Sequence, residues 1–220
     1  MTHPFAPYQP LADRLLAAFD TGSDGSHDLS HIVRVWHSAR RIAATEQNID
    51  LELVLAAVIL HDCVAVEKNS PLRDQASRLS ASRAREIIGP LDWPAARVDA
   101  LAHAIETHSF SAGLIPTTAE ARIVQDADRL DAIGAIGIAR CFHVGGRMGG
   151  ALYHPTDPAA VARAFDDRAY ALDHFPVKLY KVAAGFRTAE GQRIAAARDA
   201  LMRDFAAAFL AEVTPDGDRA

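Results

Sequence analysis

The sequence predicts an all-α fold, and three observations favour this class. Alanine, the strongest helix former, supplies about a fifth of the 220 residues, whereas aromatic residues make up only 7%. Apolar residues recur every three or four positions along most of the chain, as they do on one face of a helix. No stretch shows a convincing strand pattern. We therefore expect one all-helical domain over residues 1–220, built as a bundle around a buried central helix.

The individual helices follow from this periodicity and from the breakers between them. The segment from Leu51 to Leu60 is apolar almost all round, which is typical of a helix at the centre of a bundle. Loops are expected at residues 63–74 and at the glycine-rich run VGGRMGG, residues 144–150, which we interpret as a flap. The expected helices lie near residues 10–19, 29–43, 51–60, 75–88, 94–107, 118–131, 134–142, 158–172, 174–186 and 190–212.

Charge and composition exclude several classes of protein. The chain has 23 basic and 28 acidic residues, a formal net charge of −5, so no overall attraction to nucleic acid or to an anionic membrane is expected. The longest apolar run is too short to span a bilayer, and the N-terminus lacks the pattern of a signal peptide. Cys63 and Cys141 suit reduced thiols. We therefore expect a cytoplasmic protein with no nucleic-acid or membrane partner.

The dipeptide His61-Asp62 directly follows the buried apolar segment. An ionised carboxylate near a protein core is costly unless a positive group compensates it, and a divalent metal would do so. Further ligands must come from other helices. His31 lies beside the apolar face of its helix, and the run Val124 to Asp131 places acids within an otherwise buried stripe. Imidazole and carboxylate donors suit Mn, Fe, Co, Ni or Zn, and also Mg.

Five strings of the sequence carry a resemblance to a known family. They are HDLSHIVRVW, AAVILHDCV, THSFSAG, VQDADRLDAIGAIG and DHFPVKL. Together they resemble the HD-domain metal-dependent phosphohydrolase superfamily, with its ligand pattern H…HD…D, and within it the small stand-alone YedJ-like proteins. The likeness covers about residues 26 to 205 and implies an HD-domain helical bundle.

The resemblance implies that His31, His61, Asp62 and Asp128 coordinate one divalent ion inside the bundle. Mn is the first choice, with Mg, Co, Ni, Fe or Zn as alternatives. The ion would keep positions open for water and for a substrate phosphate oxygen. Asp62 would also hydrogen-bond the attacking water, although a separate base is an alternative.

Several polar residues are candidates for catalysis and substrate binding. In the family pattern His108 faces the site as a proton shuttle; a helix-capping histidine is the alternative. On the loop after His61-Asp62, Lys68, Asn69 and Arg73 are candidates to bind phosphate oxygens, and Lys68 also to assist catalysis. His174 and Lys178 share a helical face and form a candidate phosphate clamp, against a surface salt-bridge face. We interpret Arg129 as a structural partner of Asp126 or Asp131.

These residues predict a hydrolase of a nucleotide or a related small phosphorylated molecule, releasing pyrophosphate or phosphate. Two other hypotheses stay open. One is a dinuclear HD phosphodiesterase, for which His103 and His108 would be extra ligands. The other is a nucleotide-sensing module without turnover. The sequence is also compatible with a homodimer.

Overall fold

The computed structural model describes residues 3–18, 28–66, 72–110 and 112–214. Within these ranges helices form nearly all the regular structure, and the one extended pairing is an isolated parallel bridge between Ala151 and Tyr170. This confirms the all-α prediction. The α-helices are α1 (Gln9–Leu16), α2 (Leu29–Ala43), α3 (Leu51–Leu60), α4 (Ala76–Ile88), α5 (Ala95–His108), α6 (Ala119–Asp131), α7 (Gly134–Arg147), α8 (Tyr180–Ala183) and α9 (Ala189–Val213). Three further helical segments of other types are η1 (Arg73–Gln75), η2 (Gly89–Leu91) and η3 (Phe175–Leu179).

The chain divides into two compact units. The first comprises Met1–Arg129 with Arg187–Gly191, and the second comprises Leu130–Phe186 with Gln192–Ala220. Each unit is described below by itself. The prediction that residues 1–220 form a single domain stays a prediction.

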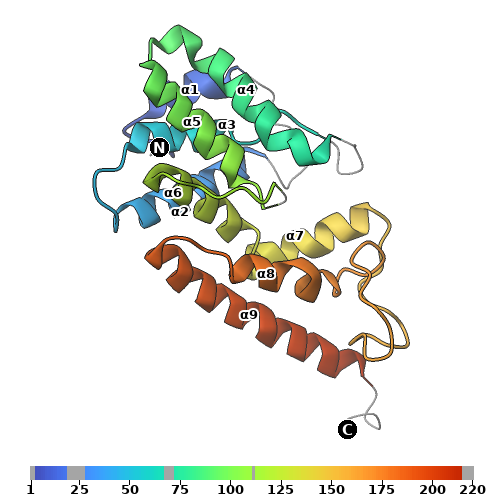
Figure 1. Ribbon diagram of the computed structural model, residues 1–220. Helices are drawn as coiled ribbons and strands as arrows, with labels where there is room; N and C mark the ends of the chain where they lie inside the picture. Colours follow the sequence, from blue (N-terminus) through green and yellow to red (C-terminus); the bar gives the residue numbers. More distant parts are fainter. Residues whose placement is uncertain (1–2, 19–27, 67–71, 111, 215–220) are drawn as a thin grey trace. The chain divides into compact units, whose positions relative to one another are not determined.

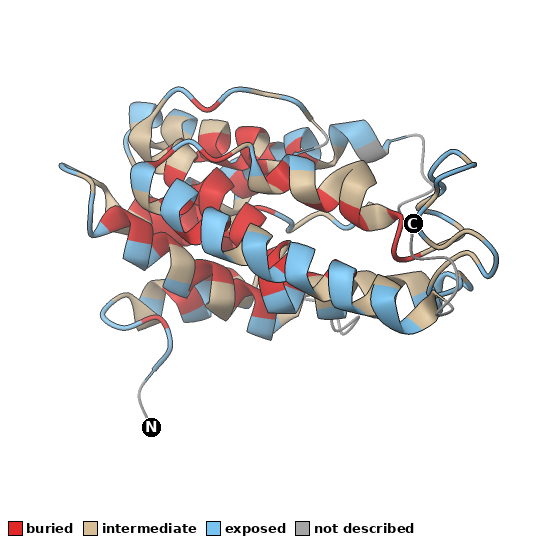
Figure 2. Cartoon of the chain, turned by 90° about the horizontal axis from the view of Figure 1, so that it is seen from below, coloured by how far each residue is buried: buried red, intermediate tan, exposed pale blue. Residues whose placement is uncertain are grey.

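Helix α3 is the centre of the first unit. Its residues from Leu53 to Leu60 are all buried, and α1, α2, α4 and α5 pack around it (Figure 1). This confirms the prediction of a central apolar helix, because a helix without a polar face is stable in water only when neighbours cover every side. The other helices carry buried residues on one side and exposed residues on another, as Figure 2 shows.

Two aspartates fix where α2 and α3 begin. Asp28 Oδ1 accepts a hydrogen bond of 3.1 Å from the backbone N–H of His31. In the same way Asp50 Oδ1 accepts one of 3.0 Å from Leu53 N–H. Each carboxylate satisfies a backbone donor that the first helical turn leaves unpaired. The cap at Asp28 thereby holds the backbone of His31, one of the expected metal ligands.

The second unit is organised around aromatic rings. Phe142 of α7 lies 5.9 Å from Phe205 and 5.8 Å from Phe209, both of α9, between ring centroids. Phe175 of η3 stacks on Phe205 at 5.9 Å. Such ring pairs add stabilisation beyond the area they bury. The cluster therefore joins α7, η3 and α9.

The prediction of a glycine-rich loop at residues 144–150 is wrong for residues 144–147, which are helical. Helix α7 continues through Val144, Gly145 and Gly146 to Arg147, so only residues 148–150 follow it. A Cβ atom on Gly145 would lie 3.3 Å from the Cβ of Ala171. The absence of a side chain therefore allows the segment around Ala171 to pack closely against the last turns of α7, and this packing outweighs the low helix propensity of glycine.

The prediction of a helix near residues 158–172 is also wrong, because the structure has no helix in this stretch. Its backbone donors find side-chain acceptors instead: Asp157 accepts 2.9 Å hydrogen bonds from the N–H groups of both Val161 and Ala162. Arg163 Nη2 donates to Asp173 Oδ1 at 2.8 Å. These contacts outweigh the helix propensity of the alanines.

The helix predicted at residues 174–186 is present but shorter than predicted. It is formed by η3 and α8 and ends at Ala183.

Candidate metal centre

Two buried histidines from neighbouring helices face each other in the first unit. His31 lies in the first turn of α2, and His61 directly follows the last residue of α3. Their Nε2 atoms are 3.3 Å apart. The carboxylate of Asp128, from α6, completes the group, with its Oδ1 atom 3.6 Å from both Nε2 atoms. Residues from α2, from the end of α3 and from α6 thus bring three donor atoms together.

The ring of His61 is oriented by its own helix. Nδ1 lies 2.7 Å from the carbonyl oxygen of Val58, and because a carbonyl can only accept, Nδ1 carries the proton and Nε2 keeps a lone pair. Burial lowers the pKa of His61, and the charges of Asp62 and Asp128 only partly oppose this. A neutral imidazole held by a backbone carbonyl through its other nitrogen is the usual state of a metal-binding histidine.

A second group of donors shares His61. Asp62 Oδ2 lies 3.6 Å from His61 Nε2, and Asp62 Oδ1 lies 3.6 Å from the Nε2 atom of His108, the last residue of α5. His108 repeats the arrangement of His61, with Nδ1 2.6 Å from the carbonyl oxygen of Ile105. Burial acts to lower the pKa of His108, but the hydrogen bond and charge of Asp62 and the charge of Asp128 outweigh it, so this pKa is raised.

The donor set fits a divalent ion. Ligand atoms bound at about 2.1 Å are ~3.0 to 3.4 Å apart in octahedral or tetrahedral geometry, and the donor pairs measured above are 3.3 to 3.6 Å apart. Both groups could hold an ion, each with its atoms within 4.8 Å of one another. Because neutral His61 offers a single lone pair at Nε2, separate ions cannot both be bound through it. The two groups therefore describe one centre around His61.

Helix α6 positions more of the site than Asp128 alone. Gln125 is fully buried, and its Nε2 donates to the carbonyl oxygens of Thr107 at 2.6 Å and of Leu114 at 3.4 Å. Thr107 precedes His108 in the last turn of α5, so this amide links the end of that helix to Leu114 in the segment that follows it. Sequence reasoning missed this role, although an amide within an apolar helical stripe is a signal that it has buried partners.

Asp126, one residue later, holds the chain where it enters α9. Its carboxylate is fully buried and accepts hydrogen bonds from the N–H groups of Arg187 and Thr188, at 2.9 and 2.7 Å, and from the hydroxyl of Thr188 at 2.7 Å. Burial raises the pKa of Asp126, against these hydrogen bonds and the nearby charge of Arg129. Gly191 fits against this pair, since a Cβ there would lie 2.5 Å from Asp126 Oδ2.

Arg129 is the buried cation beside the donors. Its charge interacts with those of Asp126 and Asp128, while burial lowers its pKa. Its guanidinium carbon also lies over the ring of Phe110, 5.3 Å from the centroid. Of the two acids that the sequence suggested as its partners, Asp131 is bound by Arg140 Nη1 at 2.6 Å.

The predicted substrate-binding residues fall in the second unit or have side chains outside the part of the chain that the structure describes. Lys68 and Asn69 fall outside the described residues, and Arg73 lies in η1 with a side chain that is also outside them. His174 and Lys178 belong to the second unit, where His174 Nδ1 is 2.8 Å from Asp167 Oδ2. Their roles in substrate binding stay predictions.

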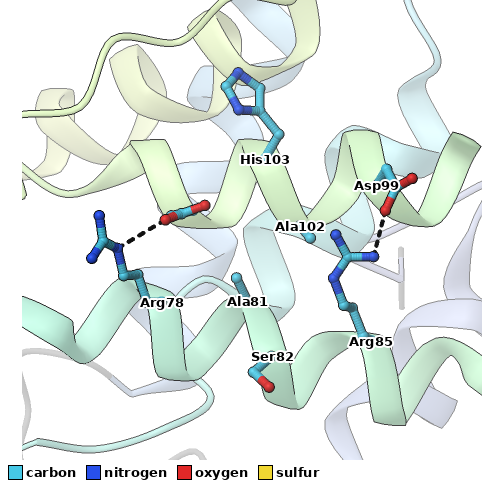
Figure 3. Close-up of a pocket in the computed structure, with 8 residues that line it drawn as sticks. Arg78, Ala81, Ser82, Arg85, Asp99, Ala102 and His103 are labelled. Carbon is cyan, nitrogen blue, oxygen red and sulfur yellow. Dashed lines mark hydrogen bonds and ion pairs between the residues drawn. The ribbon is translucent and has the colours of Figure 1, made fainter.

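His103 takes part in a different feature of the first unit. It lines a surface pocket of about 320 Å³ between α4 and α5 (Figure 3). Ion pairs cross the pocket, from Arg78 to Glu106 at 3.0 Å and from Arg85 to Asp99 at 2.6 Å. His103 Nε2 accepts a hydrogen bond of 3.0 Å from Thr117 N–H. The two donor groups of the metal centre do not include His103.

Among the described residues, no helix is both long enough and apolar enough to cross a membrane.

Comparison with known proteins places the chain in a family. The HD-domain family model matches residues 28–133, the part that contains all five donor residues. YpgQ of Bacillus subtilis (strain 168) is 32% identical over 189 residues, which is 84% of this chain and 83% of YpgQ. The crystal structure of YpgQ in complex with ADP superposes with a TM-score of 0.71 and 28% identity, covering 99% of each chain. An HD-superfamily hydrolase from Bacillus thuringiensis has a TM-score of 0.70 and 26% identity, covering 96% of this chain and 98% of that one. The chain therefore belongs to the HD-domain superfamily.

Proposed function

We propose that this protein is a metal-dependent phosphohydrolase that acts on a nucleotide or a related small phosphorylated molecule. The observation that carries the proposal is the convergence of His31, His61, Asp62 and Asp128 on one small region of the first unit. Two relatives support it. One is named a hydrolase of this superfamily, and YpgQ has been crystallised with ADP. Hydrolysis at phosphorus would release pyrophosphate or phosphate.

The ion expected in this centre is divalent, with Mn first and Mg, Co, Ni, Fe or Zn as alternatives. When bound, such an ion neutralises charge on a phosphate and lowers the pKa of a water molecule. His31 and His61 would hold it with neutral nitrogens, and Asp62 and Asp128 with carboxylate oxygens.

Asp62 and His108 are the proposed catalytic pair. The side chain of Asp62 is 41% exposed, so solvent water and substrate can reach its carboxylate. One of its oxygens faces His61 and the other faces His108 Nε2. Asp62 would accept a hydrogen bond from the attacking water and orient it. His108 Nε2 would then exchange a proton with Asp62 or with the departing oxygen.

The remaining candidates would bind the substrate phosphates. Lys68, Asn69 and Arg73 follow the His61-Asp62 pair in sequence, and His174 and Lys178 come from the second unit. Lysine and arginine contribute charge and hydrogen-bond donors to phosphate oxygens. We propose Lys68 also as a catalytic cation, which would neutralise charge that develops on the phosphoryl group.

A release assay tests the proposed function. The protein is incubated with Mn, Mg, Co or Ni and a panel of nucleoside mono-, di- and triphosphates, and phosphate and pyrophosphate are measured separately. We expect turnover that the His31→Ala variant loses. The matched control is His37→Ala, which removes an exposed histidine from the same helix. Tight nucleotide binding without turnover under any metal would instead support the sensing module.

A dinuclear phosphodiesterase is the second candidate, and the donor group that contains His108 favours it. It requires two ions per chain and activity on phosphodiesters. Sharing of His61 between the two groups argues against it. One ion per chain at saturation, measured by elemental analysis, would exclude this candidate, whereas two would support it.

A further inference from the structure

Phe110 is an exposed aromatic side chain in the segment between α5 and α6. It is 38% exposed, so part of its ring is open to solvent. The guanidinium of Arg129 covers the ring at 5.3 Å from its centroid. Arg129 is itself buried, and it fixes one side of the ring by a cation–π contact. The open part of the ring is thus presented on a supported surface.

Phe110 is connected to the metal centre through both α5 and α6, because it contacts Arg129, whose charge interacts with that of the donor Asp128. Phe110 follows His108 by two residues, so their Cα atoms are at most about 7.6 Å apart. Its partner Arg129 directly follows Asp128 in α6. Each residue of the Phe110–Arg129 pair therefore neighbours a donor residue, one from α5 and one from α6.

Hydrogen bonds hold described residues on both sides of Phe110 in place. Gln125 Nε2 donates to the carbonyl oxygens of Thr107 and Leu114, on either side of it. The carbonyl oxygen of Phe110 accepts a hydrogen bond of 3.3 Å from Gly113 N–H. A ring that is fixed before a ligand arrives loses little conformational freedom on binding.

We propose that Phe110, supported by Arg129, is the subsite for the nucleobase of the substrate. The inference rests on the proposed function, which assigns the phosphates to the metal centre. Of the parts of a nucleotide, the base alone has a π-face, and bases of every kind stack on aromatic side chains. A ring that lies two residues from the donor His108 and contacts Arg129, with part of its surface open, suits that part of the ligand. The subsite would therefore favour nucleotides over phosphorylated molecules without a base.

A pair of non-hydrolysable ligands tests this subsite without any need for turnover. Binding of α,β-methylene-ADP and of methylenediphosphonate, which lacks the nucleoside, is measured by titration calorimetry on the Mn-loaded protein. Phe110→Ala should weaken α,β-methylene-ADP about tenfold, the size expected for one stacked base, and leave methylenediphosphonate unchanged. Phe110→Trp should restore binding. The control Ile115→Ala removes a 67% exposed side chain of the same segment and should change neither affinity.

Three results would overturn the subsite. These are an unchanged affinity of Phe110→Ala for α,β-methylene-ADP, an equal loss for both ligands, and no binding of α,β-methylene-ADP to the wild-type protein. Failure of the proposed function would give a different pattern of results in the two assays. The release assay would then be negative, while the calorimetric difference between the two ligands would still depend on Phe110.

Discussion

The imidazole of His61 donates from Nδ1 to the carbonyl oxygen of Val58, 2.7 Å away and one turn earlier in α3. This bond explains why a histidine directly after a buried helix suits a metal centre. The helix end offers a carbonyl that fixes the ring, and the opposite nitrogen is directed toward His31, Asp62 and Asp128. His108 and Ile105 repeat the relationship at the end of α5.

Metal removal should lower the stability of the protein. An ion that binds the folded chain alone stabilises it by about 2.7 kcal/mol at a concentration 100 times its Kd. Scanning calorimetry after chelation, and again after Mn is restored, should show a reversible fall and rise in Tm. A Tm that does not respond to Mn, Mg, Co, Ni, Fe or Zn would contradict the proposed centre.

Replacing His108 should separate catalysis from metal binding. In His108→Gln the four proposed ligands remain, so Mn binding should persist, while loss of the proton-exchanging nitrogen should lower kcat by about 10²- to 10⁴-fold. Steady-state kinetics and elemental analysis on the same sample measure both. If the variant loses its metal, His108 is a ligand; if kcat is unchanged, it has no catalytic role.

The anchor formed by Asp126 should contribute to stability. Asp126→Ala removes the acceptor for two backbone N–H groups and a hydroxyl, so buried donors lose their partner and the free energy of unfolding should fall by about 1–3 kcal/mol or more. Thr188→Ser is the matched control, because it keeps the hydroxyl and should change stability less. Urea unfolding measures both variants, and equal stability of Asp126→Ala and wild type would contradict the anchor.

The ion pair of Asp173 and Arg163 should make stability depend on pH. Burial acts to raise the pKa of Asp173, but hydrogen bonds from Arg163 and from Asp166 N–H outweigh it, so the folded-state pKa is lowered. Between the folded and unfolded pKa values the unfolded chain binds more protons, and stability therefore rises with pH through that range. The contribution is complete above the unfolded value of about 3.8 and is lost as pH falls through the folded value.

The variant Asp173→Asn tests this dependence. Its Tm should lie furthest below that of the wild type near pH 7, and the gap should narrow as the pH is lowered below 4. A gap that stays constant over this range, followed by circular dichroism, would show that the charge of Asp173 does not stabilise the fold.

Local sequence patterns predicted the centre of the fold well. The apolar segment at 51–60 is the buried helix α3, since a run with no polar face has few alternatives. The pattern made His31 and His61 candidate ligands, and the resemblance to the HD superfamily added Asp128; the structure brings the donor atoms of all three together. Such residues are conspicuous in sequence because they are polar groups at positions that face the core.

Other features depend on contacts between residues far apart in sequence. Helix propensity alone favoured a helix at 158–172, but Asp157 and Asp173 hold that stretch in an irregular course. Gly145 and Gly146 suggested a loop, yet both lie in α7, where Gly145 packs against Ala171. The partners of Gln125 lie 11 and 18 residues away, so its role became visible only in the fold.

The central claim is that His31 belongs to a centre for one divalent ion. Calorimetric titration with Mn should show one ion bound per wild-type chain and no binding, or strongly weakened binding, by His31→Ala, while His37→Ala binds as the wild type does. Circular dichroism on each variant confirms that the helices are intact. Wild-type affinity for Mn in a folded His31→Ala protein would contradict the account.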